Sequence, residues 1–245
     1  MADDGCGGAF YDEQVTDRYL AHRHSGTSSP NVVMEEPAVL DQLGDLTGLR
    51  VLDLGCGDGS FSETVLSSGA TTYLGIDGSA AMIEIARDRH TDRRSRFEVA
   101  SMEQLEPAPG SADLVTSRMA FHYLADLRPV LRAVRVAVGG AGRLVFTVTH
   151  PVITSHDNRV AGRRTSWTVD HYFEPGARHR AWFGKQVTWY HRTIESYVSA
   201  VIAAGFGIDA ISECEPSEVL LSDEPEELAR RRRVPLMLLV AARCP

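Results

Sequence analysis

Hydrophobic positions in the middle of this 245-residue chain fall into short apolar runs that alternate with stretches of helical spacing. Short apolar runs bounded by turn residues are typical of buried strands, and apolar residues three or four positions apart are typical of helices. Strands are predicted near 50–54, 72–76, 96–100, 113–117 and 142–149, and helices near 60–68, 79–89 and 126–138. This alternation predicts an α/β fold, a doubly wound, mostly parallel sheet with helices on both faces.

The chain before the first strand has a different pattern. Helices are predicted over Tyr11–His24 and Val32–Leu43, separated by a loop rich in serine. Residues 1–48 are therefore interpreted as an N-terminal helical lid. Residues 49–245 form the core of the fold, within which 151–190 is a cap insertion.

The cap insertion has little helical periodicity and is crowded with aromatic residues. The aromatic residues between His150 and His191 include all three tryptophans of the chain: Trp167, Tyr172, Phe173, Trp182, Phe183, Trp189 and Tyr190. The segment follows the fifth predicted strand, where a doubly wound sheet places its ligand crevice. We interpret it as a cap over a ligand pocket. The alternative is a small β-ribbon whose aromatic side chains pack only on one another.

The most informative motif joins the first strand to the next helix. Residues 51–61 (VLDLGCGDGSF) run from an apolar strand through glycines at 55, 57 and 59 into a helix. Glycines at such a turn adopt backbone conformations closed to other residues and let a ligand touch the main chain. The next strand ends in Asp77, an acid placed to bind a ribose diol. A dinucleotide fingerprint would need glycine where Ser60 stands, so an NAD-dependent oxidoreductase is disfavoured.

The order Asp-x-Gly-x-Gly-x-Gly at residues 53–59 resembles motif I of the class I S-adenosylmethionine-dependent methyltransferases. Four further segments resemble later parts of that family, in order: 75–82 (GIDGSAAM), 111–117 (SADLVTS), 121–124 (FHYL) and 134–146 (VRVAVGGAGRLVF). The resemblance implies S-adenosylmethionine as the cofactor. It also implies a seven-stranded sheet, completed by strands near 207–213 and 235–242 after a helix at 193–204.

The resemblance also implies which residues bind the cofactor. The residues carried over are Gly55 and Gly57 for the methionyl part, Asp77 for the ribose hydroxyls with Gly78 next to it, Met82, Ser101 and Met102 for the adenine, and Arg23 of the lid for the methionyl carboxylate. Ser101 stands where many relatives have an acid for the adenine amino group, so a backbone contact from Met102 is expected there. Asp53 is interpreted as structural, holding the glycine loop by hydrogen bonds.

Methyl transfer from a sulfonium is a direct displacement, in which orientation and removal of water supply much of the rate. A base helps when the acceptor loses a proton. His122 follows the fourth strand and His150 the fifth, so both are candidate bases, although His150 could equally orient the following turn. Tyr19, which shares a helix face with Arg23, is a third candidate. The residues predicted to contact the acceptor are Trp167, Tyr172, Trp182 and His191.

Composition narrows the classes of partner. A net charge of −8 argues against nucleic-acid binding, and no apolar run approaches the roughly 20 residues that span a membrane. The four cysteines are dispersed, which favours a reducing cytoplasm, and the nine histidines lack the spacing of a metal triad, so no metal is expected. A monomer or a homodimer is expected.

The predicted function is transfer of a methyl group from S-adenosylmethionine to a small-molecule acceptor. The aromatic cap favours an aromatic or heteroaromatic metabolite, indole- or phenol-like, methylated at carbon, nitrogen or oxygen, as in secondary metabolism. The alternative is a catalytically silent protein of the same fold that binds a nucleoside and acts as a regulator or scaffold. The intact glycine loop, Asp77 and the histidines at strand ends favour the enzyme.

Overall fold

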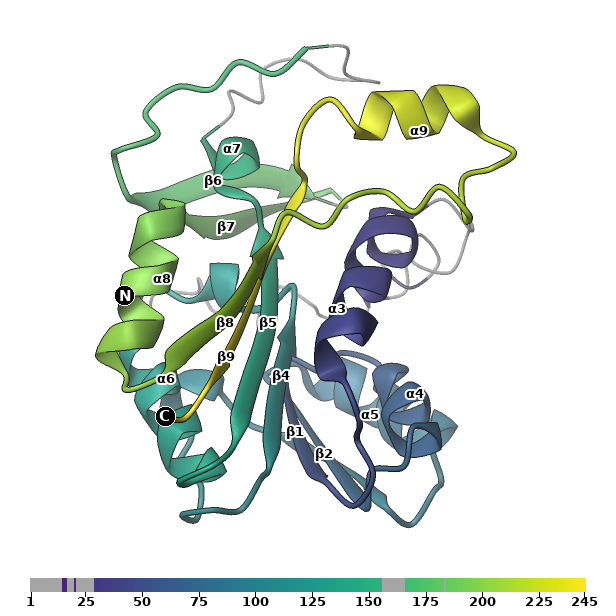
Figure 1. The fold of residues 1–245 in the computed structure, drawn as a ribbon, viewed down its shortest axis with the longest axis vertical. Coiled ribbons are helices and arrows are strands. Elements are labelled where there is room, and N and C mark those ends of the chain that lie inside the picture. Colours follow the sequence, from purple (N-terminus) through teal and green to yellow (C-terminus); the bar gives the residue numbers. More distant parts are fainter. Residues whose placement is uncertain (1–14, 17–19, 21–28, 156–165, 183) are drawn as a thin grey trace.

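A seven-stranded sheet forms the centre of the fold in the computed structural model, which describes residues 15–16, 20, 29–155, 166–182 and 184–245 (Figure 1). The strands are β1 (Arg50–Leu54), β2 (Thr72–Asp77), β3 (Ser95–Val99), β4 (Leu114–Arg118), β5 (Arg143–Thr149), β8 (Gly207–Ser212) and β9 (Met237–Arg243). Their order across the sheet is β3-β2-β1-β4-β5-β9-β8. All neighbours pair in parallel except β9, which runs antiparallel to both β5 and β8. The predicted doubly wound, mostly parallel fold is confirmed.

Helices cover both faces of this sheet. The helices of the core are α3 (Glu36–Leu43), α4 (Phe61–Ser67), α5 (Ala80–Arg89), α6 (Arg128–Val138) and α8 (Ile194–Ala203). The apolar cluster on one face includes residues of α6 and α8, and the cluster on the other face includes residues of α3, α4 and α5. Figure 1 shows these two groups on opposite sides of the strands.

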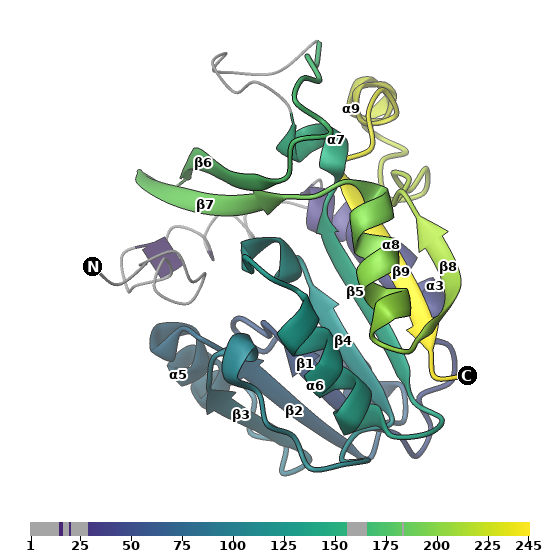
Figure 2. The ribbon, with the colours of Figure 1, turned by 90° about the vertical axis from the view of Figure 1, so that its left-hand side faces the viewer.

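Short elements gather at the carboxyl edge of the parallel strands. They are the 3-10 turns η2 (Met102–Gln104) and η3 (Phe121–Tyr123) and the helices α7 (Pro151–Thr154) and α9 (Pro225–Arg231). β6 (Gly176–Trp182) and β7 (Lys185–His191) pair as an antiparallel ribbon above this edge (Figure 2). The predicted cap segment therefore contains a β-ribbon, and its side chains contact η3 as well as one another.

The N-terminal segment differs from the single helix predicted over Val32–Leu43. It begins as a π-helical turn, η1 (Asn31–Glu35), and continues as α3. The π turn places the Glu35 carboxylate in the interior, where it is 0% exposed. There it accepts hydrogen bonds from Arg118 Nε at 3.0 Å and from Thr147 Oγ1 at 2.8 Å.

Arg118 completes this buried ion pair at the end of β4. Its side chain is 9% exposed, and its guanidinium also lies 4.4 Å from the ring centre of Phe61, the first residue of α4. A buried charge is tolerated only where it is fully paired, because leaving water is otherwise too costly. The pair therefore joins η1, β4 and α4 beneath the glycine loop.

Substitution of Glu35 by Gln should lower the free energy of unfolding by about 3 kcal/mol, because Arg118 would keep its charge in the interior without its main partner. Glu36→Gln is the matched control. Glu36 lies 3.2 Å from Nη2 of Arg118, which also donates to Glu35, but the Glu36 side chain is 40% exposed. Its loss should cost about 1 kcal/mol or less. Urea unfolding of both variants measures the difference, and equal losses would contradict this account of the pair.

Candidate functional site

The loop between β1 and α4 is held by main-chain hydrogen bonds. The N–H groups of Gly55 and Cys56 both donate to the carbonyl oxygen of Ile76 in β2, at 2.7 and 3.1 Å. Gly55 has a φ of 79°, and a Cβ placed on it would lie 2.4 Å from Cβ of Ala120. The loop therefore packs directly against the segment that follows β4, and only glycine fits at this position.

Gly57 occupies a different environment. Its φ is 57°, and a Cβ placed there would meet no atom of the described residues within 4 Å. Its N–H donates to Oδ2 of Asp77 at 2.9 Å, and the N–H of Ser79 donates to Oδ1 at 2.8 Å. A carboxylate has about four acceptor positions, so Asp77 keeps capacity for further donors. Burial raises the pKa of Asp77, and the hydrogen bonds from these two N–H groups offset only part of that rise.

The other predicted cofactor residues lie around this loop. Ser79 caps α5 by accepting the N–H of Met82, whose side chain is buried, and Gly78 is exposed at the turn before it. Ser101 caps η2 by accepting the N–H of Glu103, and the Met102 methyl group lies 3.8 Å from the Cβ position of Gly55. Ser101 and Met102 are partly buried. Their contacts with a cofactor remain a prediction.

Asp53 has partners other than those expected from the sequence. Its carboxylate accepts hydrogen bonds from Tyr73 Oη at 2.5 Å and from Thr116 Oγ1 at 2.8 Å. These residues belong to β2 and β4, the two neighbours of β1. Burial raises the pKa of Asp53, and the two hydroxyl donors oppose that rise. Asp53 therefore joins three strands below the glycine loop and does not bond to the loop itself.

His122 lies in η3, against the ribbon. Its Nδ1 accepts the N–H of Thr149 at 3.4 Å, so a neutral ring carries its proton on Nε2. Its ring centre is 5.4 Å from that of Trp189, and the two planes are nearly perpendicular. Burial, together with the charges of Arg192 and Arg180, lowers the pKa of His122 to about 3. The ring is therefore neutral at physiological pH.

His150 caps the short helix α7. Its Nδ1 accepts the N–H of Val152 at 3.2 Å, and its Nε2 lies 3.3 Å from a carboxylate oxygen of Glu213. Burial lowers its pKa, although Glu213 acts in the opposite direction. Both ring nitrogens thus face protein groups, and the side chain orients the turn after β5.

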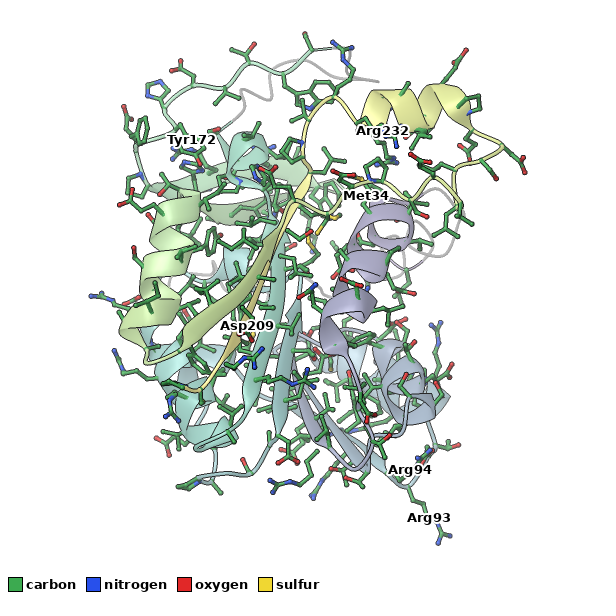
Figure 3. The ribbon with its side chains drawn as sticks, in the orientation of Figure 1. Met34, Arg93, Arg94, Tyr172, Asp209 and Arg232 are labelled. Carbon is green, nitrogen blue, oxygen red and sulfur yellow. The ribbon has the colours of Figure 1, made fainter. Side chains whose placement is uncertain are left out.

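His191 ends β7 and is equally engaged. Its Nε2 lies 2.9 Å from the carbonyl oxygen of Tyr172, which can only accept, so the ring proton sits on Nε2. Its Nδ1 then accepts from the Thr154 hydroxyl at 2.5 Å. Burial lowers the pKa of His191. Its partner Tyr172 lies at the same end of the molecule as the ribbon and α7 (Figure 3).

The two tryptophans predicted to contact the acceptor, Trp167 and Trp182, lie apart. Trp182 packs edge to face against Trp189 on the ribbon, with ring centres 6.0 Å apart. Trp167 lies elsewhere, with Arg233 at 5.8 Å from its ring centre, beyond the end of α9. Tyr19 and Arg23 of the predicted lid fall outside the described residues. The structure therefore brings together His122 and the two ribbon tryptophans but not Trp167.

Two side chains near this edge, Arg180 and Glu213, were missed by sequence reasoning, and Trp189 was named only as one of the aromatic residues of the cap. Trp189 is 8% exposed, and the Arg180 guanidinium lies 4.9 Å from its ring centre. The signal for both was the alternation along β7, where positions 187, 189 and 191 are buried. Positions 178, 180 and 182 of β6 share this face by their register. Nothing in the sequence around Glu213 indicates its role, because its contact with His150 joins segments that are far apart in the chain.

Other features of the described residues do not belong to this edge. A groove of about 430 Å³ lies between α5 and β3, and its lining residues all fall between Arg87 and Glu98. Figure 3 shows Arg93 and Arg94 of this region at the end of the molecule opposite Tyr172. Within the described part of the chain, no three acidic, histidine or cysteine side chains form a group suited to a metal ion. None of its helices is both long and apolar enough to cross a bilayer.

Comparison with known proteins identifies the class. A family described as "Methyltransferase domain" matches residues 51–142. The crystal structure of an S-adenosylmethionine-dependent methyltransferase from Mesorhizobium loti has a TM-score of 0.78 and is 33% identical, and the match covers 89% of this chain and 100% of that chain. The chain belongs to the class I S-adenosylmethionine-dependent methyltransferases. S-adenosylmethionine is its cofactor.

Curated relatives are less informative about the acceptor. An uncharacterized protein from Haemophilus influenzae is 30% identical over 231 residues, which are 88% of this chain and 89% of its own length. A malonyl-[acyl-carrier protein] O-methyltransferase from Legionella pneumophila is 38% identical over 104 residues, covering 42% of this chain and only 37% of that enzyme. The acceptor of this chain must therefore be argued from its own site.

The pKa of His122 predicts how stability depends on pH. Since the folded value of about 3 lies below the ordinary 6.5, the unfolded chain binds the additional proton between these values. The contribution of His122 is thus complete above pH 6.5 and is lost as the pH falls, by on the order of 2 kcal/mol at pH 5. His122→Asn should reduce the loss of unfolding free energy between pH 8 and pH 5 by that amount. His179→Asn, which changes an exposed histidine, should leave the loss unchanged.

Proposed function

We propose that this methyltransferase acts on a small aromatic or heteroaromatic acceptor, indole- or phenol-like, that binds between η3 and the inner face of the β6–β7 ribbon. One observation carries the proposal: a continuous line of contacts leads from the cofactor loop to the ribbon. Gly55 packs against Ala120, and two residues further along the chain His122 packs against Trp189. Methylation at carbon, nitrogen or oxygen fits this arrangement.

The cofactor half of the site fits S-adenosylmethionine, which supplies an electrophilic methyl group when bound. The open space beside Gly57 allows close approach to the main chain. The free acceptor positions of Asp77 suit two ribose hydroxyls, and Met82, Ser101 and Met102 would border the adenine. Arg23 and Tyr19 of the N-terminal lid would close over the methionyl end, as part of the same proposal.

Aromatic side chains of the ribbon form one wall of the proposed acceptor half. Trp182 and Trp189 offer ring faces and edges to a flat ligand, and Tyr172 packs edge to face on His191. Trp167 would contribute only if an acceptor extended toward α9. We also propose that the protein acts in secondary metabolism and in the cytoplasm, because small aromatic acceptors of this kind are typical of such metabolism.

The hydrogen bonds of His122 and His150 support a role in positioning the acceptor more than a role as the general base. His150 already accepts the Val152 N–H, and His122 accepts the Thr149 N–H, so each neutral ring presents an N–H and not a lone pair on its other nitrogen. Tyr19 is the remaining candidate from the sequence. We propose that His122 and His150 position the acceptor and the surrounding turns, and that orientation and exclusion of water supply most of the rate.

Gly57→Ala should weaken cofactor binding without unfolding the chain. A Cβ at this position clashes with no atom of the described residues, and the left-handed φ costs about 1–2 kcal/mol. It would nevertheless occupy the space through which a ligand reaches the main chain. Calorimetry should show at least about a tenfold weaker affinity for S-adenosylhomocysteine, equivalent to about 1.4 kcal/mol. Gly110→Ala, with a φ of 64° and open space around its Cβ, is the matched control and should bind normally.

Turnover separates the enzyme from a catalytically silent binder. We expect the wild-type protein to transfer labelled methyl from S-adenosylmethionine to a component of an extract of aromatic metabolites, identified by mass spectrometry, and Gly57→Ala to transfer far less. Binding of S-adenosylhomocysteine with no transfer to any component would favour a regulatory or scaffold role. Transfer to an aliphatic component alone would overturn the aromatic acceptor.

A further inference from the structure

The indole nitrogen of Trp189 has no hydrogen-bond partner in the described part of the chain. The residue is 8% exposed, and its Nε1 atom is shielded from solvent. Buried N–H donors in folded proteins almost always have an acceptor, because one that loses water without replacement is destabilising. An orphaned donor beside a proposed ligand site indicates an acceptor atom supplied by the ligand.

A second donor lies next to Trp189. The ring of His122 packs edge to face against the indole, and its Nδ1 is engaged with the main chain of Thr149. The proton of the neutral imidazole therefore sits on Nε2. Two side-chain N–H groups, one from η3 and one from β7, thus belong to the same contact between the core and the ribbon.

Two guanidinium groups lie near this contact. Arg180 stacks on Trp189, and among the described residues the charged groups that act on His122 are Arg180 and Arg192. Arg192 donates to the carbonyl oxygens of Leu124 and Ala125, at 2.5 and 2.7 Å. The Arg192 charge also interacts with Asp126, a carboxylate that is not among the described groups acting on His122. Two guanidinium groups beside two N–H donors favour an anionic oxygen over a cation.

From these contacts we infer that the acceptor carries a carboxylate or an equally acidic oxygen group, which binds to the N–H of Trp189 with His122 and Arg180 beside it. The inference rests on the proposed function, and it makes Trp189 a residue that determines acceptor specificity. An aromatic acid would insert its ring along the ribbon tryptophans and place its anionic oxygen at the buried donor. Hydrogen bonds from N–H groups to a carboxylate are among the stronger ones in proteins.

Two matched pairs of probes test the inference on the full chain saturated with S-adenosylhomocysteine: indole-3-carboxylate against indole, and 4-hydroxybenzoate against phenol. Calorimetry should give about tenfold tighter binding for at least one acid than for its neutral counterpart. Trp189→Phe keeps an aromatic ring and removes the N–H. It should weaken binding of that acid about tenfold and leave the neutral probe within about twofold. Trp182→Phe is the control and should keep the preference for the acid.

The wild-type protein gives an independent measurement. Its three tryptophan indole N–H groups give separate signals in nitrogen-15 NMR spectra, and the acid should move the Trp189 proton signal downfield while indole or phenol does not. This reading stands even where Trp189→Phe fails to fold. If S-adenosylhomocysteine binds but neither acid moves the Trp189 signal, the inference is overturned and the proposed function is untouched. If S-adenosylhomocysteine itself does not bind, the proposed function fails first.

Discussion

The close contact of the glycine loop with the ends of β2 and β4 determines where every other part of the site lies. The loop gives its first two N–H groups to one carbonyl oxygen of β2 and a third to Asp77, and Gly55 leaves no room for a side chain against Ala120. The segment after β4 is thereby fixed within van der Waals distance of the cofactor loop. His122 follows two residues later, so the same contact also positions the proposed acceptor half of the site.

Charged side chains below the glycine loop are paired differently from those beside the β6–β7 ribbon. Below the loop, Glu35 and Arg118 neutralise one another, and Asp53 is bonded to two hydroxyl groups. At the ribbon, Arg192 is bonded to carbonyl oxygens, and its positive charge reaches His122. The first arrangement holds strands and helices together. The second places the guanidinium groups of Arg180 and Arg192 beside the proposed acceptor site, which is a reason to propose the ribbon side as the place of recognition.

Much of the fold was predictable from local patterns. Each core strand lies within one or two residues of its predicted bounds, because glycines and polar turns interrupt the apolar runs. The buried Glu35 was not predictable, since a glutamate in a helical pattern normally faces solvent and the π turn leaves no mark in the sequence. The partners of Asp53, the Glu213 contact of His150 and the separation of Trp167 from the other tryptophans depend on the meeting of distant segments, which spacing along the chain does not encode.

The ribbon has a consequence for how this protein can diverge. The stretch that matches the methyltransferase family, 51–142, contains the cofactor loop, Asp77 and η3, and it ends before the ribbon begins at Gly176. One wall of the proposed acceptor site thus belongs to a hairpin that contributes no strand to the main sheet. Its inner positions can exchange charge and size without altering the sheet register or the loop that holds the methyl donor. New acceptors are therefore accessible through a few substitutions along one face of a hairpin, while the methyl-donating half stays the same.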